Sequence, residues 1–190
     1  MLHHVRTLVQ TGFLVAEPER HGAQGAREVP YRATGRSWNA RIPNASPLLV
    51  ETFLQQIIAL SVPLEGVEET LQTLKSKVRM GIITNGFSLP QRGRLDKLGW
   101  NSCFEPLVIS DEVQVTKPAA AIFQHALAQM GQPSPARVLM VGDNPKTDIA
   151  GAAAQGLATC WYNPGRETGP CEATHEIHHF AHLCAIVLGE

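Results

Sequence analysis

Residues 137–152 of this 190-residue chain, Arg-Val-Leu-Met-Val-Gly-Asp-Asn-Pro-Lys-Thr-Asp-Ile-Ala-Gly-Ala, decide its fold. Four consecutive apolar residues, Val138 to Val141, are followed by turn residues. Such a run is typical of a strand that is buried on both faces. Gly142 then frees the backbone to turn, and a helix is expected from Ile149 to Gln155. The stretch therefore predicts a strand, a turn and a helix.

Two carboxylates stand in that turn, Asp143 at the end of the expected strand and Asp148 five residues later. Ligands of open α/β sheets bind at the carboxyl ends of the strands. Mg²⁺ takes oxygen ligands, usually one or two carboxylates together with waters and substrate phosphate. The pair thus suggests a magnesium site, and the simpler alternative is an aspartate that caps the helix.

Two further apolar runs end in residues suited to phosphate. Residues 80–83 lead into Thr84-Asn85-Gly86, where a hydroxyl stands beside the backbone N–H groups of a glycine turn, and such groups hold phosphate oxygens. Residues 107–109 are followed by Lys117, a compact positive charge. Either feature alone is usually only a turn or a loop, but the order of hydroxyl, lysine and Gly-Asp-x4-Asp is specific.

That order resembles the second, third and fourth motifs of the haloacid dehalogenase-like (HAD) hydrolases. The sequence is most similar to that of the bacterial pyrimidine 5′-nucleotidases in four segments, residues 81–87, 107–113, 137–148 and 156–161. The resemblance extends from Pro47 to the C-terminus. The resemblance implies an α/β fold with a doubly wound parallel sheet, a HAD-like Rossmannoid core. It also implies Mg²⁺-dependent hydrolysis of a small-molecule phosphate ester, a nucleoside monophosphate of the dUMP type, through an aspartyl-phosphate.

The resemblance assigns roles to individual residues. Asp143 is expected to bind Mg²⁺, and Asp148 to orient the metal's waters or Lys117. Lys117 is expected to offset charge between the nucleophile and the phosphate, so that Lys117 and Asp148 are the catalytic candidates. The expected phosphate-binding residues are Thr84, Asn85, Gly86 and Lys117.

The first 47 residues depart from the family. Its members begin with an apolar strand that ends in Asp-x-Asp, the nucleophile and the general acid/base, but no aspartate precedes Asp96 here. The nearest mimic is Glu17-Pro18-Glu19 after the apolar residues 13–16. Glutamate is one methylene longer, and a displacement of about 1 Å can cost about a hundredfold in rate. Glu17 is therefore not expected to act as the nucleophile, and the chain is expected to have little or no catalytic activity.

The missing strand has a structural consequence as well. In this fold it lies between the strands that end at Thr84 and Asp143, and without it two inner sheet edges would be unpaired. Either residues 5–9 or residues 12–16 should substitute for it, or the core is impaired. We therefore expect an atypical, poorly ordered segment at 1–47, a remnant of a helical cap at 48–62 and the HAD-like core at 63–190.

Periodicity predicts the remaining elements. Apolar residues at spacings of three and four indicate helices, and short continuous apolar runs indicate strands. Helices are expected at 47–60, 64–74, 88–98, 119–130 and 180–188, and strands at 78–83, 104–109, 157–162 and 174–177. Alternating strands and helices favour a parallel sheet with right-handed crossovers.

The composition limits the kinds of partner and the cellular compartment that are expected. The net charge of −1 gives no excess of positive charge of the kind that nucleic-acid binding requires. No apolar run approaches the ~20 residues of a membrane span. The four cysteines lack a Cys-x-x-Cys spacing and indicate reduced thiols in a cytoplasmic protein. His178 and His182 could share a helix face as zinc ligands do, but no acidic or cysteine partner stands at a convincing spacing, so a solvated helix start is the preferred explanation.

Three other functions stay open at this point. The chain could be a non-catalytic, truncated relic that binds Mg²⁺ and phosphate weakly. It could hydrolyse another small ester, such as phosphoglycolate or a sugar phosphate, because the cap largely sets specificity. A receiver domain of two-component signalling also carries Asp, Thr and Lys at strand ends, but the Gly-Asp-x4-Asp after the lysine argues against it.

Overall fold

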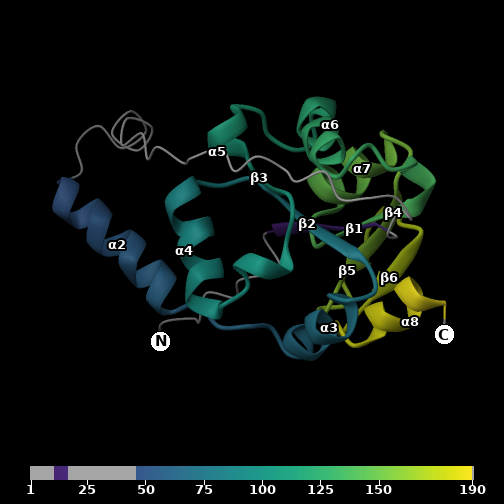
Figure 1. The fold of residues 1–190 in the computed structure, drawn as a ribbon, viewed down its shortest axis with the longest axis horizontal. Coiled ribbons are helices and arrows are strands. Elements are labelled where there is room, and N and C mark those ends of the chain that lie inside the picture. The colour runs from purple at the N-terminus through teal and green to yellow at the C-terminus, as the bar shows by residue number, and fades with distance from the viewer. Residues whose placement is uncertain (1–10, 17–45, 190) are drawn as a thin grey trace.

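A computed structural model describes residues 11–16 and 46–189 of the chain. Its centre is a six-stranded sheet in the order β3-β2-β1-β4-β5-β6, with helices on both faces (Figure 1). The strands are β1 Thr11–Ala16, β2 Arg79–Thr84, β3 Leu107–Ile109, β4 Val138–Gly142, β5 Ala158–Tyr162 and β6 His175–Ile177. The α/β class that the alternating pattern predicts is confirmed.

The helices follow the predicted order, with the short helix α5 as an addition that the periodicity does not predict. They are α2 Pro47–Ala59, α3 Val67–Leu74, α4 Ser88–Leu98, α5 Ser110–Val113, α6 Ala120–Gln129, α7 Ala150–Ala153 and α8 His182–Leu188, with the short turns η1 Asn101–Cys103, η2 Pro135–Arg137 and η3 Pro145–Ile149. Helix α3 begins later than predicted because Gly66 takes a left-handed φ of 77° at its N-cap. The helix expected from Ile149 begins only after the π-helical turn η3.

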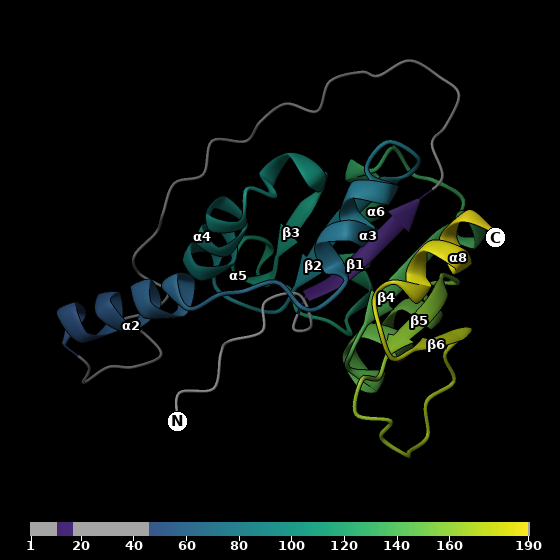
Figure 2. The ribbon, with the colours of Figure 1, turned by 90° about the horizontal axis from the view of Figure 1, so that it is seen from below.

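The two faces of the sheet bury separate apolar clusters. Successive residues of a strand point to opposite faces, so Val15 joins one cluster and Ala16 the other. The first cluster lies under α3 and α8, which cover the same face of the sheet (Figure 2). The second lies under α6 and includes Ile122, Phe123 and Met140, all fully buried. Helices therefore cover both faces of the sheet.

Strand β1 occupies the central position but runs against its neighbours. It pairs antiparallel with β2 and with β4, whereas the pairs β2–β3, β4–β5 and β5–β6 are parallel. Of the two segments expected to fill the gap, residues 12–16 do so, and residues 5–9 lie outside the described ranges. Thr11 pairs with Thr84, and Ala16 pairs with Arg79 and Val138. Strand β1 therefore fills the central place in the sheet, and the sheet is parallel, as expected, except for this strand.

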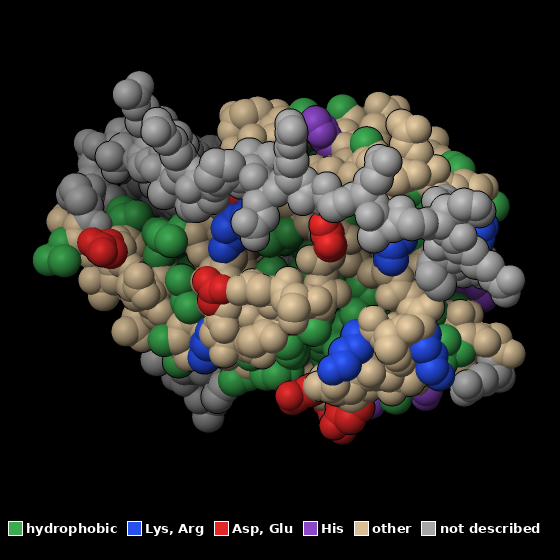
Figure 3. All heavy atoms as spheres, in the orientation of Figure 1, with side chains coloured by type: hydrophobic (Ala, Val, Ile, Leu, Met, Phe, Trp, Pro, Cys, Tyr) green, Lys and Arg blue, Asp and Glu red, His purple; other side chains and the backbone are tan. Residues whose placement is uncertain are grey.

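Helix α2 lies at one end of the molecule beside α4 (Figure 1). Ile58 of α2 contacts Gly93 of α4, while Leu48, Leu49 and Phe53 are exposed by 72, 65 and 59%. Figure 3 shows hydrophobic side chains gathered over this end of the molecule. Its assignment as the remnant of a cap stays a prediction. Within residues 11–16 and 46–189, none of the helices has the length and apolar character that crossing a membrane requires.

Candidate active site

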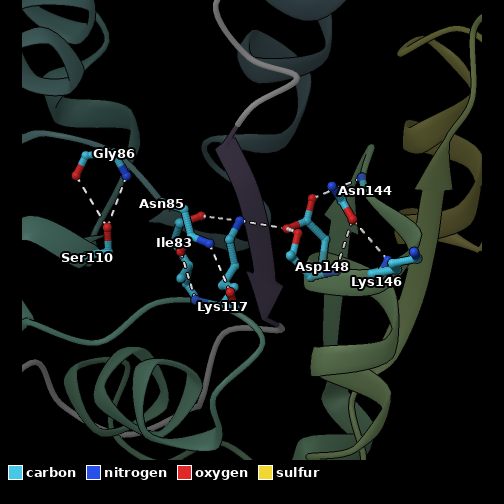
Figure 4. A network of polar contacts seen from close by, with 9 residues as sticks. Ile83, Asn85, Gly86, Ser110, Lys117, Asn144, Lys146 and Asp148 are labelled. Carbon is cyan, nitrogen blue, oxygen red and sulfur yellow. Dashed lines mark hydrogen bonds and ion pairs between the residues drawn. The ribbon is translucent and has the colours of Figure 1, made fainter.

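The centre of the site is a buried ion pair at the carboxyl edge of the sheet. Lys117 Nζ lies 2.7 Å from Asp148 Oδ1, and the two side chains are only 2 and 3% exposed. The same ammonium donates to the carbonyl of Ile83, at 2.9 Å, near the end of β2. Figure 4 shows the pair meeting across β1, with Lys117 reaching from the β2 side and Asp148 from the β4 side. Sequence motifs that are 31 residues apart thus converge over the central strand.

Asn85 fixes the backbone of Lys117. Its Nδ2 donates to the Lys117 carbonyl at 2.9 Å, and its Oδ1 accepts from the Lys117 N–H at 2.8 Å. An amide that satisfies both backbone groups of one residue holds that residue in a single orientation. Asn85 therefore joins the turn after β2 to the lysine loop, a contact that its place in the sequence does not reveal.

The η3 turn fixes Asp148 from the other side. Asp148 accepts hydrogen bonds from the Asn144 N–H and from the Thr147 hydroxyl, both at 3.2 Å. A Cβ atom at Gly142 would lie 2.5 Å from Asp148 Cβ, a distance that real Cβ atoms essentially never show. The glycine before Asp143 is thus required for the close approach of Asp148, a reason for it beyond the turn that the sequence suggests.

Asp143 lies beside this pair and is half-buried. Burial, followed by the negative charge of Asp148, raises the pKa of Asp143 to about 6 from 3.8, and the charge of Lys117 opposes the shift. The Trp161 indole N–H donates to the Asp143 carbonyl at 3.0 Å. A carboxyl that is partly desolvated next to a second carboxylate favours a cation, since a cation would relieve the repulsion.

The residues present fit Mg²⁺ with Asp143 as its protein ligand. Both oxygens of Asp148 already accept hydrogen bonds or an ion pair, and the part of the chain that the structure describes holds no group of three His, Cys, Asp or Glu side chains suited to a metal. Mg²⁺ does not need such a group, because it is commonly held by one or two carboxylates, waters and phosphate. The histidines of the C-terminal segment do not form such a site either, and His178 Nδ1 instead lies 2.7 Å from the Asn163 carbonyl.

The turn after β2 places the other predicted phosphate ligands. Thr84 is fully buried at the end of β2, and Asn85 lines an adjacent cavity of about 270 Å³ together with Ser110 and Thr116. The Gly86 N–H donates to the Ser110 hydroxyl at 3.0 Å, so this amide is already engaged. Ser110 was not among the predicted residues, although its place directly after an apolar run could have drawn attention to it.

The carboxyl edge receives no carboxylate from β1. The strand enters at this edge with Thr11 and leaves at the opposite edge with Ala16. Glu17 and Glu19, the mimic of the nucleophile motif, lie outside the described residues, and the strand that precedes them ends on the far side from Asp143. Among the six residues of β1 none is acidic.

Comparison with known proteins agrees with this geometry. The family model of the haloacid dehalogenase-like hydrolases matches residues 10–156. The chain therefore belongs to this family of hydrolases, as the resemblance implies.

Among individual relatives, the pyrimidine 5′-nucleotidase YjjG of Escherichia coli is 42% identical over 134 residues, which cover 70% of this chain and 60% of the relative. The glyceraldehyde 3-phosphate phosphatase of Methanothermobacter thermautotrophicus is 38% identical over 122 residues, 62% of this chain and 54% of the relative. The magnesium-bound HAD-hydrolase YfnB of Bacillus subtilis superposes with a TM-score of 0.63 at 29% identity, covering 65% of this chain and 55% of that one. The match to each of these relatives spans little more than half of the relative's length.

Proposed function

We propose that the chain is a HAD-type phosphate monoester binding domain whose ligands are pyrimidine nucleoside 5′-monophosphates, with Mg²⁺ held at Asp143. The observation that carries this proposal is the buried Lys117–Asp148 pair, 2.7 Å apart, at the carboxyl ends of β2 and β4. A cation held rigidly at strand ends is suited to neutralising phosphate oxygens. The similarity to the pyrimidine 5′-nucleotidase supports the substrate class.

Among the residues that the structure describes, Lys117 has two partners and so keeps one donor for a ligand. An ammonium carries three N–H groups, and Ile83 and Asp148 take two of them. The third can point to a phosphate oxygen, next to the Thr84 hydroxyl and the Asn85 backbone. When bound at Asp143, Mg²⁺ would add positive charge beside the phosphate and polarise its P–O bonds. Asp148 holds Lys117 in place and carries no transferred proton in this scheme.

Hydrolysis is a separate matter from binding. A HAD phosphatase needs a carboxylate on the central strand to attack phosphorus, and β1 brings none to the carboxyl edge. We therefore propose that the chain keeps the phosphate-binding half of the machinery and turns its ligand over at or near background. The four cysteines are unpaired, which supports the reducing, cytoplasmic setting proposed for it.

The test is hydrolysis of dUMP and p-nitrophenyl phosphate with Mg²⁺, measured beside an Asp143→Asn variant, together with calorimetric titration of inorganic phosphate. We expect phosphate to bind in a Mg²⁺-dependent manner and to bind less well to the variant, while neither protein hydrolyses the esters above background. Turnover that the variant loses would reveal a replacement nucleophile and make Glu17 and Glu19 the next residues to change. Absence of phosphate binding would overturn the proposal and favour a relic without function.

A second ligand class deserves the same titration. The similarity to the glyceraldehyde 3-phosphate phosphatase favours a short phosphate ester, and phosphoglycolate is a further ester of this kind. Tighter binding of either ester than of dUMP would replace the nucleotide as the proposed ligand without changing the role of the buried ion pair.

A further inference from the structure

A second cavity lies beside the turn that follows Asp143. It has a volume of about 350 Å³ and is lined by residues 144–146, Trp161 and residues 167–170. The first of these segments follows β4 and the last follows β5, and the two strands are parallel. Because parallel strands end at the same edge, this cavity opens on the edge of the sheet that carries the Lys117–Asp148 pair.

The walls of this cavity are held in place by hydrogen bonds from both sides. Asn163, only 3% exposed, accepts from the Glu167 N–H at 2.9 Å and donates to the Glu167 carbonyl at 3.0 Å. On the facing wall, the Asn144 side chain accepts from the Lys146 N–H at 3.0 Å. Trp161 is anchored through its indole N–H to the Asp143 carbonyl. The cavity is thus preformed and is tied directly to the proposed metal ligand.

The lining combines flat apolar surfaces with two opposite charges. Pro145, Trp161 and Pro170 supply the apolar surface. Lys146 and Glu167 are exposed at the cavity, and neither forms an ion pair within the described ranges. Small-molecule sites commonly show this pattern of apolar walls with a few polar groups that fix orientation. A planar ring with both a carbonyl and an N–H on its edge matches these groups.

We propose that this cavity binds the pyrimidine base of the nucleotide while the phosphate lies at Lys117, an assignment that rests on the proposed function. The ring would lie against Pro145 and the edge of Trp161. Lys146 would donate to a ring carbonyl, and Glu167 would accept from the ring N–H. Specificity for the base would then come from the core domain itself.

The test is calorimetric titration of the full chain, in the presence of Mg²⁺, with inorganic phosphate, deoxyuridine and dUMP. Thr168→Trp places a bulky ring at the exposed lining position 168 and should block the cavity. We expect it to weaken dUMP binding at least tenfold and to leave phosphate binding unchanged. Thr73→Trp, on exposed α3 surface, is the matched control and should change neither affinity. Thermal melts of both variants verify that they fold.

The outcomes separate this inference from the proposed function. Equal dUMP affinity in Thr168→Trp and the unaltered chain, or dUMP binding no tighter than phosphate, would overturn the cavity assignment and leave the phosphate site standing. If phosphate fails to bind but deoxyuridine binds and Thr168→Trp abolishes that binding, the proposed function fails and the cavity assignment holds. Glu167→Gln provides a second variant, which should weaken deoxyuridine binding and leave phosphate binding unchanged.

Discussion

Strands β4 and β1 lie side by side in the sheet, yet they differ in what they bring to the active-site edge. Both contribute residues to the two apolar clusters. The chain leaves β4 at the carboxyl edge, directly into Asp143 and the turn that positions Asp148, whereas it leaves β1 at the opposite edge. An apolar strand can thus complete a sheet without bringing a catalytic carboxylate to the active-site edge. Packing depends on which face a side chain points to, and catalysis depends also on the strand direction.

The largest loss of stability should come from removing the carboxylate of Asp148, which the turn after β4 positions. Asp148→Ala leaves the ammonium of Lys117, 2% exposed, without its carboxylate, and loss of one partner of a buried pair costs about 3–5 kcal/mol. Urea denaturation measures the difference. A Lys117→Met, Asp148→Leu double variant is the control, since replacing both charges with apolar groups should recover much of the stability. A loss below about 1 kcal/mol in Asp148→Ala would show that the pair is solvated.

A matched pair of truncations compares the two strands directly. Val15 in β1 and Val141 in β4 are 4 and 2% exposed and belong to the same apolar cluster. Each change to Ala removes two methylene equivalents and leaves a small cavity, at a cost of about 2 kcal/mol. Equal losses in urea denaturation are expected if β1 is a full member of the sheet. A loss for Val15→Ala that is much smaller than that for Val141→Ala would show that β1 packs only loosely.

Gly142→Ala tests the close approach of Asp148 to β4. The added methyl would lie 2.5 Å from Asp148 Cβ, and forcing such a contact costs about 1–3 kcal/mol. We expect a lower thermal midpoint together with weaker phosphate binding, because Asp148 and Lys117 shift. Gly165→Ala, where the nearest atom is 3.7 Å away, should change neither. Unaltered phosphate binding in Gly142→Ala would indicate that the position of Asp148 is not critical.

The smallest effect concerns the charge of Asp143. Its pKa is raised to about 6, so the folded chain retains this proton at pH values where the unfolded chain has lost it. Stability from this group is therefore present below about pH 4 and is lost as the pH rises through about 6. Relative to Asp143→Asn, the unaltered chain should lose on the order of 1 kcal/mol between about pH 4 and pH 7, after allowance for its partial exposure.

Thermal melts at the two pH values measure this difference. Adding Mg²⁺ at neutral pH should raise the midpoint of the unaltered chain and leave that of Asp143→Asn unchanged, because a ligand stabilises only the form that binds it. A Mg²⁺ response of equal size in both proteins would place the metal elsewhere.

The sequence predicts the parallel strands and their helices well. The runs at β2, β4 and β5 are short, continuous and bounded by turn residues, and each lies where its pattern places it. The direction of β1 could not be predicted, because an apolar run indicates that a strand is buried but not whether it runs parallel or antiparallel to its neighbours. Hydrophobic periodicity also says nothing of the late start of α3 or of the π-helical turn η3, which depend on local backbone geometry.

The candidate site shows the same division. Motif order indicates that Thr84, Lys117, Asp143 and Asp148 belong to one site, and the fold brings them to one edge of the sheet. The motif order does not show which side chains contact each other, among them the Asn85 amide on the Lys117 backbone and the Trp161 indole on the Asp143 carbonyl. Contacts of this kind join segments far apart in the chain, so no local pattern reports them.

The direction of β1 is the central claim, and nuclear Overhauser effects between Cα protons test it most directly. In an antiparallel sheet, residues facing each other as non-hydrogen-bonded pairs have Cα atoms about 4.5 Å apart, so their Cα protons give strong effects. We predict such effects at alternate facing pairs in the register Phe13–Ile82, Leu14–Gly81 and Val15–Met80. A parallel pattern, in which residue 16 instead approaches Thr84, would contradict the account and would bring Glu17 to the carboxyl edge beside Asp143.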